Sequence, residues 1–214
     1  MVTKLKSGGK ESKRFSLKNG FKFFLNANIL LFVIVMLFVI NKNSWPEDEL
    51  TGVYVFLFVF AEPASILLSI ISCFSPDKMA FPRKMKWSHS KEEWIGFGIA
   101  VVGLSLFSLI FLGAGVPWPS TIVFLMLMTN AMFALYSILF HPITIGLYRA
   151  NVYDKKETIA DYIFKYIAIC FSGVNYYIQL TLLRLPLLIN KLFAIVFALI
   201  LIWQAFTVIG VFNL

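Results

Sequence analysis

The chain has few of the side chains on which catalysis and metal binding depend. It contains two histidines and two cysteines in 214 residues, and charged residues make up only 14% of it. We find no P-loop, no glycine-rich dinucleotide motif and no metal-type spacing of histidine and cysteine. General acid–base chemistry needs such groups within reach of a substrate. We therefore expect no catalytic residue, no metal and no cofactor.

Apolar residues are abundant instead. Hydrophobic residues make up 59% of the chain, against about 45–50% in an ordinary soluble domain, and the mean hydropathy is +0.82. The excess lies in blocks of about 20 residues, the length that a helix needs to cross the hydrocarbon core. The sequence predicts an all-α, polytopic membrane helical bundle with six transmembrane helices: Phe23–Ile40, Val53–Phe74, Trp94–Ala114, Thr121–Phe140, Ile163–Leu183 and Leu192–Phe212.

The domain organisation is simple. Residues 1–22 form a basic cytoplasmic tail, and residues 23–214 form a single transmembrane bundle, because no polar segment is long enough for a separate soluble domain. The last two blocks are separated only by Arg184–Lys191. Five spans with a re-entrant or interfacial piece therefore remain an alternative to six.

The distribution of charge predicts the topology. The net charge is +8, and lysine and arginine gather in the N-terminal tail and in the loops after the second and fourth blocks. Such residues collect on the cytoplasmic side of a membrane, so six spans would leave both termini cytoplasmic. Arg184 and Lys191 are the exception, because this topology directs them outward.

The basic tail also predicts contact with the membrane surface. Near an anionic leaflet each basic residue contributes about 1 kcal/mol of attraction, although the same charges can act only as a topology signal. We expect no nucleic acid as a partner. The candidate surface residues are Lys13, Arg14, Lys18 and Lys22.

Glu62 is the most distinctive residue, because it is the only carboxylate deep inside an apolar block. Burying an acidic side chain at this depth costs a few kcal/mol, and intramembrane carboxylates commonly bind ions, protons or substrate. Pro63 follows it and cannot donate the helical hydrogen bond to Val59. Glu62, at the head of a stripe of serines, is therefore our first candidate for a ligand- or ion-binding residue. The alternative is a structural role as a protonated, hydrogen-bonded carboxylic acid.

Amide side chains provide the other candidates. Asn130 lies on a polar stripe of the fourth block, and Asn175 and Gln179 lie on one of the fifth. Residues at these helical spacings share one face, so we expect the stripes to turn inward and Glu62 to look toward Asn130 and Asn175. Interhelical hydrogen bonding is the alternative role for the amides.

The third block carries small residues at helical spacing, which allow two helix backbones to approach closely. Gly96, Ala100 and Gly103 form this expected helix-packing ridge.

These features favour a multi-pass integral membrane protein that acts through partners, as an accessory subunit, assembly factor or chaperone of a membrane complex. Besides the lipid bilayer, we expect a membrane-protein partner or a homo-oligomer. The alternatives are a small proton- or cation-coupled transporter or channel that uses Glu62, and a lipid-modifying membrane enzyme. The sequence does not distinguish the plasma membrane from an internal membrane.

Overall fold

The computed structural model describes residues 15–60, 62–74, 89–154 and 157–213. It is all-helical, with 86% of residues in helices and no strand in the described ranges. The elements in chain order are α1 (Leu17–Val39), η1 (Lys42–Ser44), α2 (Glu49–Val59), α3 (Glu62–Cys73), α4 (Lys91–Ser108), η2 (Leu109–Ala114), α5 (Ser120–Val152), α6 (Ile159–Leu182) and α7 (Leu187–Phe212).

Five helical stretches of the described chain are long and apolar enough to cross a bilayer: Leu17–Val39, Glu49–Cys73, Lys91–Ala114, Ser120–Val152 and Leu187–Phe212. The predicted membrane character agrees with this finding. The helix α6, which contains most of the predicted fifth span, is not among the five. The predicted count of six spans is therefore not confirmed.

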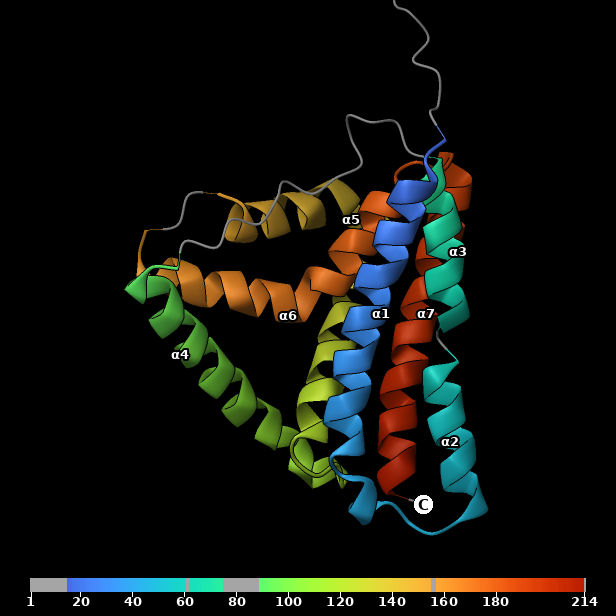
Figure 1. Ribbon diagram of the computed structural model, residues 1–214, viewed down its shortest axis with the longest axis vertical. Coiled ribbons are helices and arrows are strands. Elements are labelled where there is room, and N and C mark those ends of the chain that lie inside the picture. Colours follow the sequence, from blue (N-terminus) through green and yellow to red (C-terminus); the bar gives the residue numbers. More distant parts are fainter. Residues whose placement is uncertain (1–14, 61, 75–88, 155–156, 214) are drawn as a thin grey trace, which may run out of the picture.

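The helices separate into a bundle and a side arm. In Figure 1, α1, α7, the α2–α3 pair and the first part of α5 run along the long axis, whereas α4 slants away from them. The last part of α5 and the first part of α6 run across this direction and meet the start of α4. The side arm thus consists of α4, the last part of α5 and the first part of α6, which lie at one side of the bundle.

The bundle core is apolar and uses small residues on α7. Ala198 and Ala205 are fully buried, and they belong to the same cluster as Phe38 and Phe58. The rings of Phe38 and Phe58 stack with their centroids 5.2 Å apart, and Trp45 packs on Phe38 at the same centroid distance. Offset ring packing of this kind adds about 0.5–1.5 kcal/mol beyond burial of area. Small residues on α7 therefore make room for aromatic side chains from α1 and α2.

Hydrogen bonds show which segments lie together at the end of the bundle where α1 begins. The Ser16 amide, just before α1, donates to the Cys73 carbonyl at the end of α3 (2.8 Å). Arg184, in the turn between α6 and α7, donates from Nη1 to the Ser72 carbonyl (3.3 Å). The start of α1, the end of α3 and the α6–α7 turn therefore lie together.

Hydrogen bonds also connect the segments at the opposite end of the bundle. Asn41, after α1, donates to the Pro117 carbonyl (3.0 Å) and to Ser120 Oγ (2.9 Å). Asn213, after α7, donates to the Ala114 carbonyl (2.8 Å). The start of α1 and the C-terminal end of α7 thus lie at opposite ends of the bundle, as Figure 1 also shows.

The helix α5 changes direction at Phe140, whose backbone angles (φ −118°, ψ 40°) are not helical. Pro142 follows two residues later and lacks the N–H that would bond to the Ile138 carbonyl. The Lys191 ammonium of α7 donates to that carbonyl instead. A kink in an apolar helix is tolerated where a neighbouring side chain satisfies the freed backbone group, and here α7 supplies it.

Candidate functional site

A cluster of amide and hydroxyl side chains joins α5 to α6 inside the protein. The Asn175 amide nitrogen Nδ2 donates to Ser137 Oγ (2.9 Å), and the Asn175 backbone N–H donates to Asn130 Oδ1 (3.1 Å). Asn130 Nδ2 donates to the Cys170 carbonyl (2.8 Å). Asn130 and Asn175 are 1% and 2% exposed. The structure therefore brings together the expected polar stripes of α5 and α6.

The same cluster continues toward the kink of α5 and along α6. Ser137 Oγ also contacts Thr144 Oγ1 (3.0 Å), so two hydroxyls bridge the residues on either side of Phe140. Gln179 Nε2 donates to Asn175 Oδ1 (3.3 Å), whereas its own carbonyl oxygen has no partner within the described chain. Nearly all of the polar atoms in the cluster are occupied by one another. This arrangement holds two helices together and leaves little capacity for a ligand.

Glu62 does not join this cluster. It begins α3, directly after the interruption that separates α3 from α2, and the two helices meet near the middle of the long axis (Figure 1). Its side chain is half-buried, and no hydrogen bond or ion pair links it to Asn130 or Asn175 in the described part of the chain. The expectation that Glu62 looks toward the two asparagines is therefore wrong, because α3 packs chiefly on α1 and the asparagines face the α5–α6 contact.

The serines that follow Glu62 on α3 form hydrogen bonds within that helix. Ser65 Oγ donates to the Glu62 carbonyl (2.8 Å) and Ser69 Oγ donates to the Ser65 carbonyl (2.6 Å). Each of these hydroxyls therefore uses its donor within α3 and keeps only its acceptor capacity. Gln204 Nε2 of α7 donates to the Phe58 carbonyl in the last turn of α2 (3.3 Å), one residue before Val59, whose carbonyl Pro63 cannot reach.

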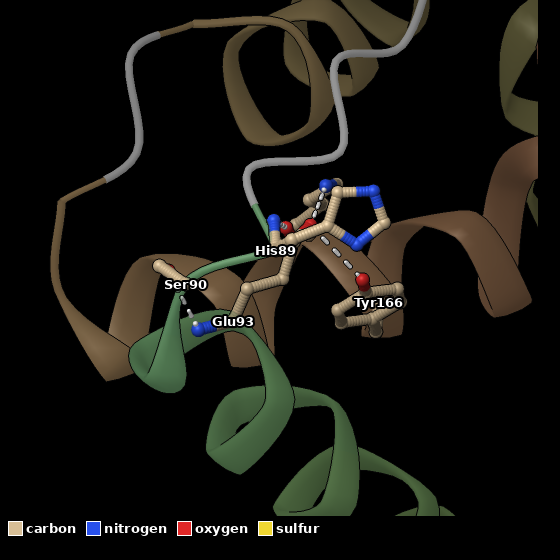
Figure 2. A network of polar contacts seen from close by, with 5 residues as sticks. His89, Ser90, Glu93 and Tyr166 are labelled. Carbon is tan, nitrogen blue, oxygen red and sulfur yellow. Dashed lines mark hydrogen bonds and ion pairs between the residues drawn. The ribbon is translucent and has the colours of Figure 1, made fainter.

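A buried ion pair joins α4 to α6, and its carboxylate Glu93 belongs to the polar network of Figure 2. Lys165 Nζ lies 2.5 Å from Glu93 Oε1, and the two side chains are only 2% and 3% exposed. The desolvation cost of two buried charges is recovered only where further polar contacts satisfy them. Glu93 lies just before the predicted span Trp94–Ala114 and Lys165 lies near the start of the predicted span Ile163–Leu183, so neither position predicts the pair.

Tyr166 and Tyr162 complete the surroundings of the ion pair. Tyr166 Oη donates to Glu93 Oε1 (3.1 Å), and Lys165 Nζ lies 5.2 Å and 5.6 Å from the ring centroids of Tyr166 and Tyr162. Burial, followed by the contact with Glu93, raises the pKa of Tyr166 to about 12. The phenol therefore stays protonated at physiological pH and remains a donor to the carboxylate.

Glu93 also caps α4. Ser90 Oγ accepts from the Glu93 N–H (3.2 Å), and Glu93 Oε2 accepts from the His89 N–H (3.1 Å). Ser-x-x-Glu before an apolar run is a sequence signature of a helix start, and Ser90-Lys91-Glu92-Glu93 carries it. That signature would have placed the start of α4. One carboxylate thus starts α4 and fixes it to α6.

The predicted packing ridge on α4 is only partly used. A Cβ on Gly96 would lie 2.5 Å from Tyr162 Cβ and 3.1 Å from the Ile159 carbonyl oxygen, so α4 and α6 touch closely there. Ala100 is 2% exposed. A Cβ on Gly103 would meet nothing within 4 Å. Gly103 is therefore not a packing residue within the described part of the chain, because no neighbouring helix approaches this position.

The candidate membrane-surface residues lie partly outside the described ranges. Lys13 and Arg14 fall in residues 1–14, whereas Lys18 and Lys22 lie on the first turns of α1. Among the described residues no group of three or more histidine, cysteine, aspartate or glutamate side chains could hold a metal ion.

Comparison with known proteins gives no relative. No family model, no curated protein and no solved structure matches the chain.

Proposed function

We propose that the chain is an integral membrane protein that crosses the bilayer five times and acts by binding another membrane protein through the α2–α3 surface around Glu62. The observation that carries this proposal is the position of the carboxyl. It lies where two half-helices meet near mid-bundle, and no side-chain partner for it lies in the described part of the chain. Intramembrane carboxylates are costly unless they are paired, so a group from a second protein is the natural partner.

The surface around Glu62 suits a helix of another protein. Phe56, Phe60 and Ile66 flank the interruption and are 63%, 53% and 46% exposed. An apolar surface of this kind would face lipid in an isolated chain. A partner helix with a basic or amide side chain at the same depth could satisfy Glu62 while packing on these residues.

The five-crossing topology removes the charge exception of the six-span prediction. Arg184 lies at the same end of the bundle as the start of α1 and the end of α3. One side of the membrane then carries most of the basic residues, which makes it the cytoplasmic side by the positive-inside rule. This side includes the loop after α3, the residues after α5, Arg184 and Lys191. The loop between α1 and α2 has Lys42 against Glu47, Asp48 and Glu49, and lies on the other side. In this topology α6 begins and ends on the cytoplasmic side, and the C-terminus is external.

A reporter fused to the C-terminus tests the topology. We expect alkaline phosphatase at this position to be active and green fluorescent protein to be dark, since only an external terminus gives both results. A fluorescent C-terminal fusion would reject the five-crossing topology in favour of an even number of crossings.

Photo-crosslinking tests the partner surface. A photoreactive amino acid at Ile66, one turn beyond Glu62, should give a discrete protein adduct in native membranes. The same probe at Leu139 of α5, which is 75% exposed, is the matched control. We expect Glu62→Gln to reduce the Ile66 adduct severalfold, and mass spectrometry to distinguish a foreign protein from a second copy of the chain. Lipid adducts alone at both positions would overturn the proposal.

Proton- or cation-coupled transport is the second candidate, and the helix interruption beside Glu62 favours it. Interrupted helices place backbone carbonyls next to ion sites in many transporters. In liposomes that contain only this purified chain, Glu62→Gln should then abolish a pH- or cation-driven flux. Equal flux for the variant and the parent chain would reject this role.

A further inference from the structure

The segment between α1 and α2 encloses a cleft of about 510 Å³. It lies at the end of the bundle opposite the start of α1, where the chain leaves α1, forms η1 and enters α2. Small-molecule sites generally occupy about 300–1,000 Å³ and combine apolar walls with a few placed polar groups. The residues that line the cleft include Lys42, Trp45, Glu47, Asp48 and Thr51.

Two polar atoms of residues that line the cleft have no partner within the described chain. The hydroxyl of Thr51 is buried without a hydrogen bond, and the residue is only 5% exposed. The indole nitrogen of Trp45 is likewise buried and unpaired. Leaving a buried polar group unsatisfied costs about 1–3 kcal/mol. Both groups belong to residues that line one cleft, so a ligand there would gain two donors once these side chains turn toward it.

The charges that line the cleft define the chemistry of that molecule. Glu47 and Asp48 supply two carboxylates, while Lys42, the Trp45 N–H and the Thr51 hydroxyl supply three donors. The carboxylates suit an ammonium group, and an indole ring adds attraction for a cation. The donors suit the oxygens of a phosphate or carboxylate. A ligand that carries both charges would satisfy both sets of residues.

We propose that this cleft binds a zwitterion with an ammonium group and an oxyanion, the chemistry shared by a phosphoethanolamine lipid headgroup and a small soluble zwitterion. The ammonium group would contact Glu47 and Asp48. The oxyanion would accept from Lys42, from the Trp45 indole and from Thr51. This site is independent of the proposed partner surface, because the cleft lies at the start of α2 whereas Glu62 lies at the start of α3.

Soluble and lipid probes distinguish the two sources. Calorimetric titration of the purified chain with glycerophosphoethanolamine should give saturable binding, and glycerol phosphate and ethanolamine alone should each bind at least tenfold more weakly. Native mass spectrometry of chain extracted from mixed phosphatidylethanolamine and phosphatidylcholine nanodiscs should retain the ethanolamine lipid selectively. Binding of the soluble probe without lipid retention would support the site and assign it to a free zwitterion.

Two variants and one control make the test specific. Glu47→Gln with Asp48→Asn should lower affinity about tenfold or more, and asparagine keeps the N-cap of α2 that Asp48 provides through the Leu50 N–H. Thr51→Val should lower affinity about fivefold while leaving the melting temperature of the ligand-free chain equal or higher, because valine removes an unpaired hydroxyl. Glu49→Gln, a neighbouring carboxylate outside the cleft lining, should change affinity less than twofold.

The proposal fails if neither probe binds the parent chain. It also fails if the Glu47→Gln, Asp48→Asn double variant binds as tightly as the parent, or if Glu49→Gln weakens binding as much as the double variant does.

Discussion

Neutralising Glu93 should strongly destabilise the contact between α4 and α6. Its carboxylate lies 2.5 Å from Lys165 Nζ, and both side chains are almost fully buried. Removing one member of such a pair takes away the opposite charge that stabilised the other member and typically costs about 3–5 kcal/mol. Glu93→Gln is the clean perturbation, because glutamine at this position can still cap α4. We therefore expect a loss of this size from the charge and little from the cap.

A double-mutant cycle separates the pair from its surroundings. Lys165→Met keeps the length of the side chain and should also cost about 3–5 kcal/mol, whereas the double variant leaves no unpaired charge and should lie much closer to the parent chain. Reversible unfolding in mixed micelles measures the free energies. Glu92→Gln, a neighbouring exposed carboxylate in the same helical turn, is the control and should change stability by less than about 0.5 kcal/mol. Additive single-variant effects, or losses below about 1 kcal/mol, would refute the reasoning.

Three further predictions concern packing and can be checked in the same unfolding assay. Asn175→Leu removes the hydrogen bond to Ser137 and should cost about 1–2 kcal/mol; no loss would mean that the α5–α6 cluster is not stabilising. Gly96→Ala should destabilise the chain because its Cβ would lie 2.5 Å from Tyr162 Cβ, whereas Gly103→Ala should be neutral or gain up to about 1 kcal/mol of helix propensity; equal effects would contradict the packing. Lys191→Met should cost about 1–3 kcal/mol by leaving the Ile138 carbonyl unsatisfied, and Pro142→Ala should recover part of this loss by restoring a backbone donor; an unrescued loss would assign Lys191 another role.

Helical periodicity predicted the facing stripes of α5 and α6 because their partners lie on two long, neighbouring helices. Asn130 and Asn175 recur on polar faces, and two polar faces in an apolar protein must meet. The same reasoning failed for Glu62. Periodicity indicates which side of a helix is polar, but the neighbour of that side depends on how the helices are arranged, and here α3 packs on α1.

Hydropathy separates α6 from the candidate spans, because this 24-residue helix is less apolar than the five helical stretches that could cross a bilayer. The kink at Phe140 directs the end of α5 sideways, and α6 follows it (Figure 1). The position of Lys165 also distinguishes α6 from an ordinary membrane span. A lysine in a predicted span is expected to reach the membrane edge, whereas this one is 2% exposed and paired with a residue 72 positions earlier.

Polar side chains of α7 donate hydrogen bonds to the backbone at both interruptions in the apolar helices. Gln204 donates to the Phe58 carbonyl where α2 ends, and Lys191 donates to the Ile138 carbonyl that Pro142 leaves free. Each donor lies on a different turn of the same helix, so α7 fixes both the α2–α3 break and the bend that creates the side arm. A broken helix without such a donor would leave a carbonyl in hydrocarbon at a cost of several kcal/mol. Both breaks therefore leave carbonyls to be satisfied, and the polar side chains of the last helix bind one carbonyl at each break.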